Sequence, residues 1–223
     1  MSTKNFPTIT LAIDLVLFGI INQRLVLLAG HRTEAPYINR ASLPGTYVCV
    51  DESAEETCTK KIKSIGLKPS YLEQLATFSE PNRDPRKRII AMAYYGLIPV
   101  PQNLPAGDSR INRFKWVDAE DAKKLSWAFD HGVMVKTALE RLRAKIQYSP
   151  VSPHFLPKEF TISELALVYD AILGRKIDLS NFRRDLLRQN LVVEIGTRQV
   201  RGPLARTYTW NWKNKNKFLL SLG

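Results

Sequence analysis

The N-terminal part of the chain begins with two apolar runs separated by a short polar break. Residues 8–21 are rich in β-branched and aromatic side chains, and two polar residues separate them from a second apolar run, residues 24–29. Two such runs joined by a two-residue break predict a β-hairpin. Further strands are predicted over residues 86–100 and 114–117, the second followed by Asp118 in a position to cap a helix.

A capped helix is predicted to begin at Ala54. Ser53 and Glu56 have the spacing of a capping box, in which each side chain bonds the backbone amide of the other residue. Gly66 is placed to end this helix in a left-handed conformation. We expect one narrow apolar face to be buried, formed by Cys58, Ile62 and Ile65.

The C-terminal part predicts two helices followed by two strands. Thr161 and Glu164 form a second capping box, and Gly174 is placed to end the first helix. A second helix is predicted over residues 180–190. Residues 191–212 then contain two strand-like runs joined by a basic, glycine-containing hairpin tip.

The helix predicted over residues 180–190 has an apolar side and a basic side. At about 100° per residue, the apolar side gathers Leu179, Phe182, Leu186 and Leu187. The opposite side carries Asn181, Arg184 and Arg188, with Arg183 on its flank. Guanidinium and amide groups make bidentate contacts with base edges, so these residues are predicted to contact bases or nearby phosphates.

An amphipathic helix is predicted over residues 132–148. Its apolar positions recur at steps of four, three and four, namely Val135, Leu139, Leu142 and Ile146. They either pack into the core of their own domain or form a dimer contact that also couples two domains. We expect both roles, because the helix leads directly into the next segment.

Three prolines in eight positions, residues 150–157, follow this helix. Since no helix interior tolerates that density, we interpret the segment as a semi-rigid connector between two domains, residues 1–148 and 149–223. A proline-rich loop inside a single domain is the alternative.

Composition excludes several classes of protein. The chain has 223 residues, 44% of them hydrophobic, which is typical of a globular protein. We expect no membrane span, because no apolar run approaches about 18 residues. We expect no secretory signal, because the first residues lack an apolar run and a small-residue cleavage site. Two cysteines and three scattered histidines give no disulfide framework or zinc pattern. These features predict a cytoplasmic protein without a metal.

The net charge of +12 is unevenly distributed. Residues 175–223 hold 11 basic and 3 acidic side chains, the highest density in the chain. A polyanionic partner is therefore predicted for the C-terminal end.

Residues 45–67 resemble a Nudix box. Gly45, Gly66 and Leu67 stand at the spacing of that box, with Asp51 in place of its first glutamate. The remaining acidic positions of the box are occupied by Thr59-Lys60 and Lys63-Ser64. Hydrolysis requires carboxylates that hold a hard cation. The resemblance therefore implies a Nudix domain without catalytic residues.

Residues 71–95 resemble the corresponding region of Nudix proteins that recognise ADP-ribose. Together with residues 125–149, they are similar to the Nudix-related transcriptional regulators of NAD metabolism. The resemblance implies an α+β fold, a Nudix-type αβα sandwich followed by a winged helix-turn-helix domain. We interpret His131 as a residue that caps or packs at a helix start, because no nucleophile or metal set accompanies it.

Forked guanidinium groups match phosphate oxygens, so Arg83, Arg86 and Arg88 are predicted to bind the pyrophosphate. A solvated surface loop is the alternative for these three. By resemblance to the ligand site of the family, the pocket is also expected to include Arg32, Tyr47 and Asp51.

Helix, turn, helix and basic hairpin is the order of a winged helix-turn-helix. Ser180 is expected to be the N-cap of its helix or a phosphate donor. The minor groove or DNA backbone is assigned to Arg198, Arg201 and Arg206. The alternative is a small structural domain with a solvated basic helix.

The combined prediction is a homodimeric repressor of NAD synthesis or salvage genes. It would bind a palindromic double-stranded DNA operator, use no cofactor, and sense ADP-ribose or a related adenine dinucleotide. Relatives that respond to a sugar, ATP or NAD leave the effector open. One alternative is an active Nudix hydrolase of ADP-ribose or NADH with an appended nucleic-acid-binding domain, and another is an RNA-binding or scaffold protein.

Overall fold

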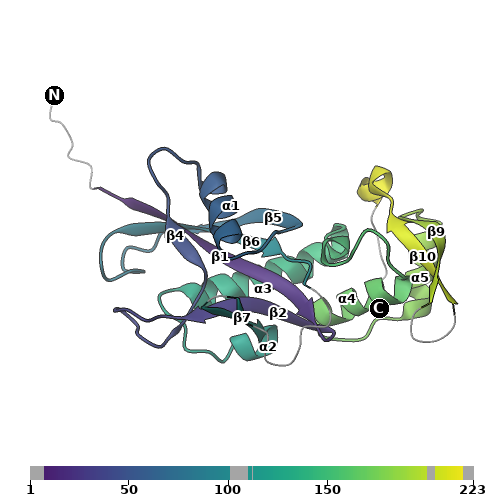
Figure 1. Cartoon of the computed structure of the whole chain (residues 1–223), viewed down its shortest axis with the longest axis horizontal. Coiled ribbons are helices and arrows are strands. Elements are labelled where there is room, and N and C mark those ends of the chain that lie inside the picture. Colours follow the sequence, from purple (N-terminus) through teal and green to yellow (C-terminus); the bar gives the residue numbers. More distant parts are fainter. Residues whose placement is uncertain (1–7, 101–109, 112, 200–203, 218–223) are drawn as a thin grey trace.

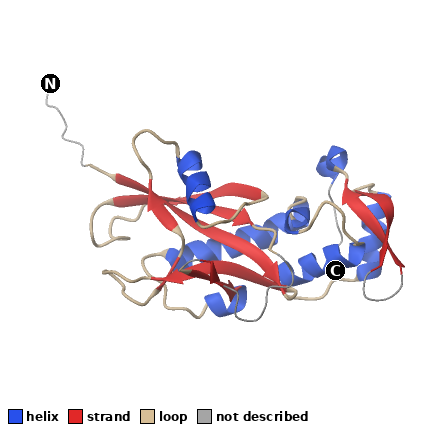
Figure 2. Ribbon diagram, viewed as in Figure 1, coloured by secondary structure: helices blue, strands red, loops and turns tan. Residues whose placement is uncertain are grey.

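The structure is a computed structural model and describes residues 8–100, 110–111, 113–199 and 204–217. A mixed sheet with helices on both faces occupies one end of the molecule, and a smaller group of helices with a hairpin occupies the other (Figures 1 and 2). Within these ranges, no helix combines the length and the apolar character needed to cross a bilayer.

The large sheet is built around its first strand. Its strands are β1 (Thr10–Ile21), β2 (Arg24–His31), β3 (Ala41–Ser42), β4 (Gly45–Tyr47), β5 (Tyr71–Phe78), β6 (Ile89–Leu97), β7 (Arg110–Ile111) and β8 (Phe114–Asp118). The main path runs β5-β6-β1-β2-β8-β7, with β3 on β2 and β4 on β1. The predicted hairpin is confirmed, because Ile21 pairs with Arg24 at the turn between β1 and β2.

The two faces of the sheet are covered by different helices. On one face, Ile13, Leu15 and Leu17 of β1 pack with α1 (Ala54–Ser64). On the other face, Val16 and Phe18 belong to the cluster that contains α3 (His131–Tyr148). This period-two alternation produces the predicted αβα sandwich.

The local signals around α1 are confirmed. Ser53 Oγ accepts a hydrogen bond from the Glu56 amide at 3.2 Å, and the Glu56 carboxylate accepts one from the Ser53 amide at 2.8 Å. Gly66 has φ +86° after the helix. The predicted apolar face of Cys58, Ile62 and Ile65 is buried.

The rest of the chain forms a winged helix-turn-helix. After the short α2 (Ala119–Ala122), capped by Asp118, and α3, its elements are η1 (Ser152–Phe155), α4 (Ile162–Leu173), α5 (Leu179–Arg188), β9 (Val192–Gln199), β10 (Leu204–Trp210) and η2 (Trp212–Lys217). The β9–β10 hairpin is antiparallel, and Phe160 bridges to Tyr208 at its edge. The capping box of Thr161 and Glu164 is present, and Gly174 ends α4 with φ +70°.

The proline-rich segment, interpreted from its sequence as a semi-rigid connector between two domains, is packed against both parts of the chain. It folds into the 3₁₀ helix η1, and Val151, Phe155 and Leu156 are buried. One apolar cluster continues from β1 through this segment to Trp210. The proline-rich chain is therefore part of the packed core, because its apolar side chains can be buried beside prolines that exclude an α-helix. The division at residue 148 remains a prediction.

Candidate functional site

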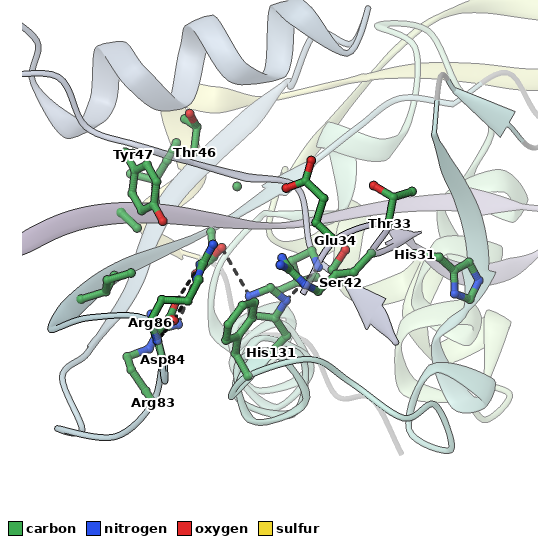
Figure 3. A pocket seen from close by; sticks show the side chains of 18 of the residues that line it. His31, Thr33, Glu34, Ser42, Thr46, Tyr47, Arg83, Asp84, Arg86 and His131 are labelled. Atoms are coloured by element: carbon green, nitrogen blue, oxygen red, sulfur yellow. Dashed lines mark hydrogen bonds and ion pairs between the residues drawn. The ribbon is translucent and has the colours of Figure 1, made fainter. Parts of the chain in front are cut away.

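A polar pocket of about 300 Å³ opens where β1, the end of β2, β4, the loop before β6 and the start of α3 meet (Figure 3). Figure 3 shows Arg83, Asp84 and Arg86 on one side of it and Glu34 and Ser42 toward the other. Further polar and aromatic lining residues are Asp14, Arg32, Tyr47, Arg113, Phe129 and His131.

Gly45 allows the chain to pass close to β1 at this pocket. A Cβ atom at this position would lie 2.8 Å from the Ile13 carbonyl oxygen and against the Asp14 carboxylate. The strand β4 pairs with β1 here, Gly45 opposite Asp14. The absence of a side chain therefore brings Thr46 and Tyr47 to the pocket wall.

Arg83 forms the floor of the pocket. Its guanidinium donates to both carboxylate oxygens of Asp130, at 2.8 and 2.6 Å, and lies 3.4 Å from the Asp14 carboxylate. Its side chain is only 4% exposed. Burial works against the charge, but the bonds to Asp130 outweigh it and raise the pKa of Arg83. The Arg83 guanidinium is thus already bonded to protein carboxylates, and these bonds hold the floor of the pocket in place.

His131 begins α3 and is a buried residue in the lining of the pocket. Its Nδ1 accepts a hydrogen bond from the Leu43 amide at 3.0 Å, so the ring proton belongs on Nε2, which faces Asp14 at 3.5 Å. Burial lowers the pKa of His131, against the influence of Asp14 and Asp130. The prediction that His131 packs at a helix start is confirmed.

Two accessible cations flank an aromatic ring in the wall. Arg86 pairs with Asp84 through two bonds, at 3.0 and 2.7 Å, and 41% of its side chain remains exposed. That hydrogen-bonded pairing raises the pKa of Arg86. Arg32 donates to the Pro36 carbonyl at 2.7 Å. The guanidinium carbons of Arg32 and Arg86 lie 4.8 and 5.2 Å from the centre of the Phe129 ring.

The structure brings together four of the six predicted ligand residues. Those that line the pocket are Arg32, Tyr47, Arg83 and Arg86. Asp51 and Arg88 are not among the lining residues, and Arg88 instead donates to the Glu80 carbonyl at 3.0 Å. Sequence reasoning missed Phe129, because no pattern of neighbouring residues predicts its left-handed backbone, with φ of +52°. It also missed Asp14, because a single acid inside an apolar strand gave no motif.

The glutamates in α1, the helix that corresponds to the Nudix box, and just before it are engaged in other bonds. Glu52 pairs with Lys60 at 2.8 Å, Glu55 accepts from the Tyr94 hydroxyl at 3.0 Å, and Glu56 belongs to the capping box. Cys49, Asp51 and Glu52 place ligand atoms within 4.8 Å of one another, but the Glu52 carboxylate is already used by Lys60 and Thr57. This donor set does not fit the carboxylate-rich cation site that hydrolysis needs.

The N-cap of α5 is Asp178, so the first of the two roles predicted for Ser180, N-cap or phosphate donor, is wrong. Asp178 Oδ1 accepts from the amides of Ser180 and Asn181 at 2.9 and 3.0 Å. The Asn181 side chain also donates to Asp178, at 2.9 Å. Aspartate caps as well as serine, and the helix begins one residue earlier than predicted.

The buried side of α5 is narrower than predicted. Phe182, Asp185 and Leu186 are buried, whereas Leu179 and Leu187 are 46% and 45% exposed. The error arises because Leu187 lies about 100° round the helix from Leu186. The outward surface still carries Arg184 and Arg188, whose side chains are 65% and 70% exposed, and Arg183 lies beside them on the same helix.

The arginines of the hairpin are placed differently from the prediction of a basic tip. Arg198 lies in β9 and bonds both carboxylate oxygens of Glu164, at 2.7 and 2.8 Å. Arg206 lies in β10 and pairs with Glu194 across the hairpin at 3.1 Å. Longer strands than predicted shorten the tip, and Arg201 lies outside the described residues.

Comparison with known proteins supports both halves of this arrangement. Residues 153–209 match the family model described as the NrtR DNA-binding winged helix domain. A curated relative is the ADPR responsive transcriptional repressor NtrR of Acinetobacter baylyi, 29% identical over 205 residues, which are 89% of this chain and 80% of the relative.

Two solved structures extend the similarity to the whole fold. The crystal structure of Shewanella oneidensis NrtR with a 27mer DNA has a TM-score of 0.78 and 30% identity, covering 92% of this chain and 95% of that one. The Nudix domain of the same protein with ADP ribose has a TM-score of 0.54 and 29% identity over 64% of this chain and 94% of that one. With its Nudix-type sandwich and matching winged helix domain, the chain belongs to the NrtR family and is homologous to its ADP-ribose-responsive repressors.

Proposed function

We propose that the chain is a DNA-binding transcriptional repressor whose affinity for its operator is lowered by ADP-ribose. One observation carries the proposal: a single chain joins an arginine-lined pocket in a Nudix-type sheet to a winged helix with a basic outer surface. Relatives with the same two parts are described as an ADPR responsive repressor and as a protein in complex with DNA. Residues 1–148 would bind the nucleotide and residues 149–223 would bind DNA, as the predicted domains imply.

The pocket would bind ADP-ribose, or a related adenine dinucleotide, through charge and stacking. Arg86 and Arg32 are the accessible guanidinium groups on the wall, and both suit pyrophosphate oxygens. The Phe129 ring lies close to both guanidinium groups, and Tyr47 is 42% exposed with the Lys87 ammonium 4.9 Å from its ring. The exposed Tyr47 ring would stack with adenine. Arg83 would act indirectly, by holding the floor in place.

The winged helix would bind double-stranded DNA through α5. Arg184 and Arg188 project from its outer surface and would contact base edges or phosphates, with Arg183, Ser180 and Asn181 beside them. Arg198 and Arg206 would follow the backbone. A homodimer would place two copies of α5 about 34 Å apart, which suits a palindromic operator upstream of genes for NAD synthesis or salvage.

The chain would bind ADP-ribose without hydrolysing it. Lys60 and Lys63 stand where the Nudix box carries acids, and the nearby Glu52, Glu55 and Glu56 are engaged in other bonds. Positive charge on this helix opposes the binding of Mg²⁺. Retained hydrolysis is the competing function, and release of AMP in the presence of Mg²⁺ or Mn²⁺ would identify it.

Titration calorimetry with ADP-ribose tests the pocket. Arg86→Ala is expected to weaken binding by about tenfold or more, since a charge-assisted contact contributes about 1.5–3 kcal/mol. Arg88→Ala is the matched control, because Arg88 is two residues away and does not line the pocket. Equal effects of the two substitutions would contradict the proposed site.

A further inference from the structure

The helix α3 reaches from the nucleotide pocket to the DNA-binding helices. At its start, His131 lines the pocket and Asp130 bonds the floor residue Arg83. Asp130 is the N-cap residue, yet its carboxylate makes no cap bond because Arg83 occupies it. The helix has 18 residues, a length of about 27 Å at about 1.5 Å per residue. The helix is therefore long enough to link the pocket floor to the winged helix.

Arg143 lies near the other end of α3 and joins three elements. Its Nε donates to the Ile172 carbonyl of α4 at 2.9 Å, and its Nη2 donates to Glu120 of α2 at 2.8 Å. Its side chain is 31% exposed. Arg143 thus ties α3 both to the Nudix-type part and to the winged helix.

The carbonyl oxygen that Arg143 bonds has no hydrogen-bond partner within its own helix, α4. Ile172 lies in the last turn of α4, where carbonyl oxygens have no partner within the helix. The residue is fully buried, so its carbonyl depends on a partner from elsewhere in the protein. A guanidinium at this end is also favoured by the helix dipole.

We propose that Arg143 is the positioning residue that transmits nucleotide binding in the pocket to the winged helix. The proposal rests on the proposed function and names its route. A ligand that favours one position of α3 favours one position of α4 only as far as the two helices move together. Arg143 makes α3 and α4 move together, because its guanidinium is carried on α3 and bonds the Ile172 carbonyl of α4. The same planar group also bonds Glu120 of α2.

The test is the coupling factor between the two ligands. Fluorescence anisotropy gives the Kd for operator DNA with and without saturating ADP-ribose, and calorimetry gives the Kd for ADP-ribose with and without DNA. Linkage requires the two ratios to be equal. The full-length wild-type protein is compared with Arg143→Ala, Arg143→Lys and Lys136→Ala. Lys136 is an exposed cation on the same helix and serves as the matched control.

Arg143→Ala is expected to lower both ratios by about threefold or more, while the Kd for ADP-ribose without DNA changes little. Arg143→Lys is expected to fall between it and the wild type, because an ammonium cannot hold both partners in the same geometry. Lys136→Ala should keep the wild-type ratio. If Arg143→Ala does not fold, Arg143→Lys decides the question.

A wild-type ratio in both Arg143 variants would overturn the role of Arg143 and leave the proposed function intact. If the wild-type protein itself binds no DNA, or binds it equally with and without ADP-ribose, the proposed function fails instead.

Discussion

At the residue scale, the pocket floor is distinguished by buried charge. Arg83 and Asp130 have side chains that are 4% and 19% exposed, and Asp14 lies beside them. A buried ion pair contributes little net stability over apolar packing, but removal of one partner leaves an uncompensated charge. The arrangement thus fixes the geometry of the floor more than it adds to stability.

Arg83→Met is therefore expected to lower the free energy of unfolding by about 3 kcal/mol or more. Chemical denaturation measures the change. Arg24→Met is the control, because Arg24 pairs with Asp118 while 74% of its side chain is exposed, and such surface pairs contribute about 1 kcal/mol at most. Similar losses in the two variants would show that the Arg83 pair is not buried in solution.

His131 predicts a pH dependence of stability. Burial keeps its pKa below the ordinary value, so below about pH 6.5 the unfolded chain binds a proton that the folded protein does not. The free energy of unfolding then decreases as the pH falls, by up to about 1.4 kcal/mol per pH unit, until the folded pKa is reached.

His131→Gln should flatten the decrease in stability between pH 6.5 and 5 without abolishing it. Burial also lowers the pKa of the half-buried His154, so part of the dependence remains. Denaturation curves recorded at several pH values measure both slopes. An unchanged slope in the variant would mean that His131 is not the group responsible.

At the scale of elements, local signals predicted boundaries well because their causes are local. The capping boxes at Ser53 and Thr161 and the left-handed Gly66 and Gly174 depend on residues within one turn of each other. The outward surface of α5 was predicted less well, because the part of a short helix that is buried depends on how its neighbour packs. In the structure Phe182 lies 4.8 Å from Tyr169 of α4, ring centre to ring centre.

The N-cap of α5 can be tested by comparing substitutions at two nearby residues, Asp178 and Ser180. Asp178→Ala removes the acceptor for two backbone amides and should lower the free energy of unfolding by about 1–2 kcal/mol. Ser180→Ala is expected to change it by about 0.5 kcal/mol at most, because Ser180 is not the cap. Thermal unfolding of both variants measures this difference. A larger loss in Ser180→Ala than in Asp178→Ala would contradict the assignment of Asp178 as the N-cap.

At the scale of the whole molecule, two groups of basic side chains outside the pocket lie on different helices. Arg184 and Arg188 lie on the outer surface of α5, whereas Lys60 and Lys63 lie on α1. The sequence predicted both groups. It did not predict the pocket floor, because Asp14, Arg83 and Asp130 come from three distant segments that only the sheet and α3 bring together. Nor did it predict that η1 packs into a core shared by both parts.

The central claim is that one chain couples a nucleotide pocket to a DNA-binding surface without consuming the nucleotide. Its most direct test is an anisotropy titration of upstream operator DNA at fixed salt and with Mg²⁺, with and without ADP-ribose, while AMP is quantified in the same samples. The predicted result is a sequence-specific complex that ADP-ribose weakens while no AMP appears. Steady release of AMP, or a DNA affinity that ADP-ribose leaves unchanged, would contradict it.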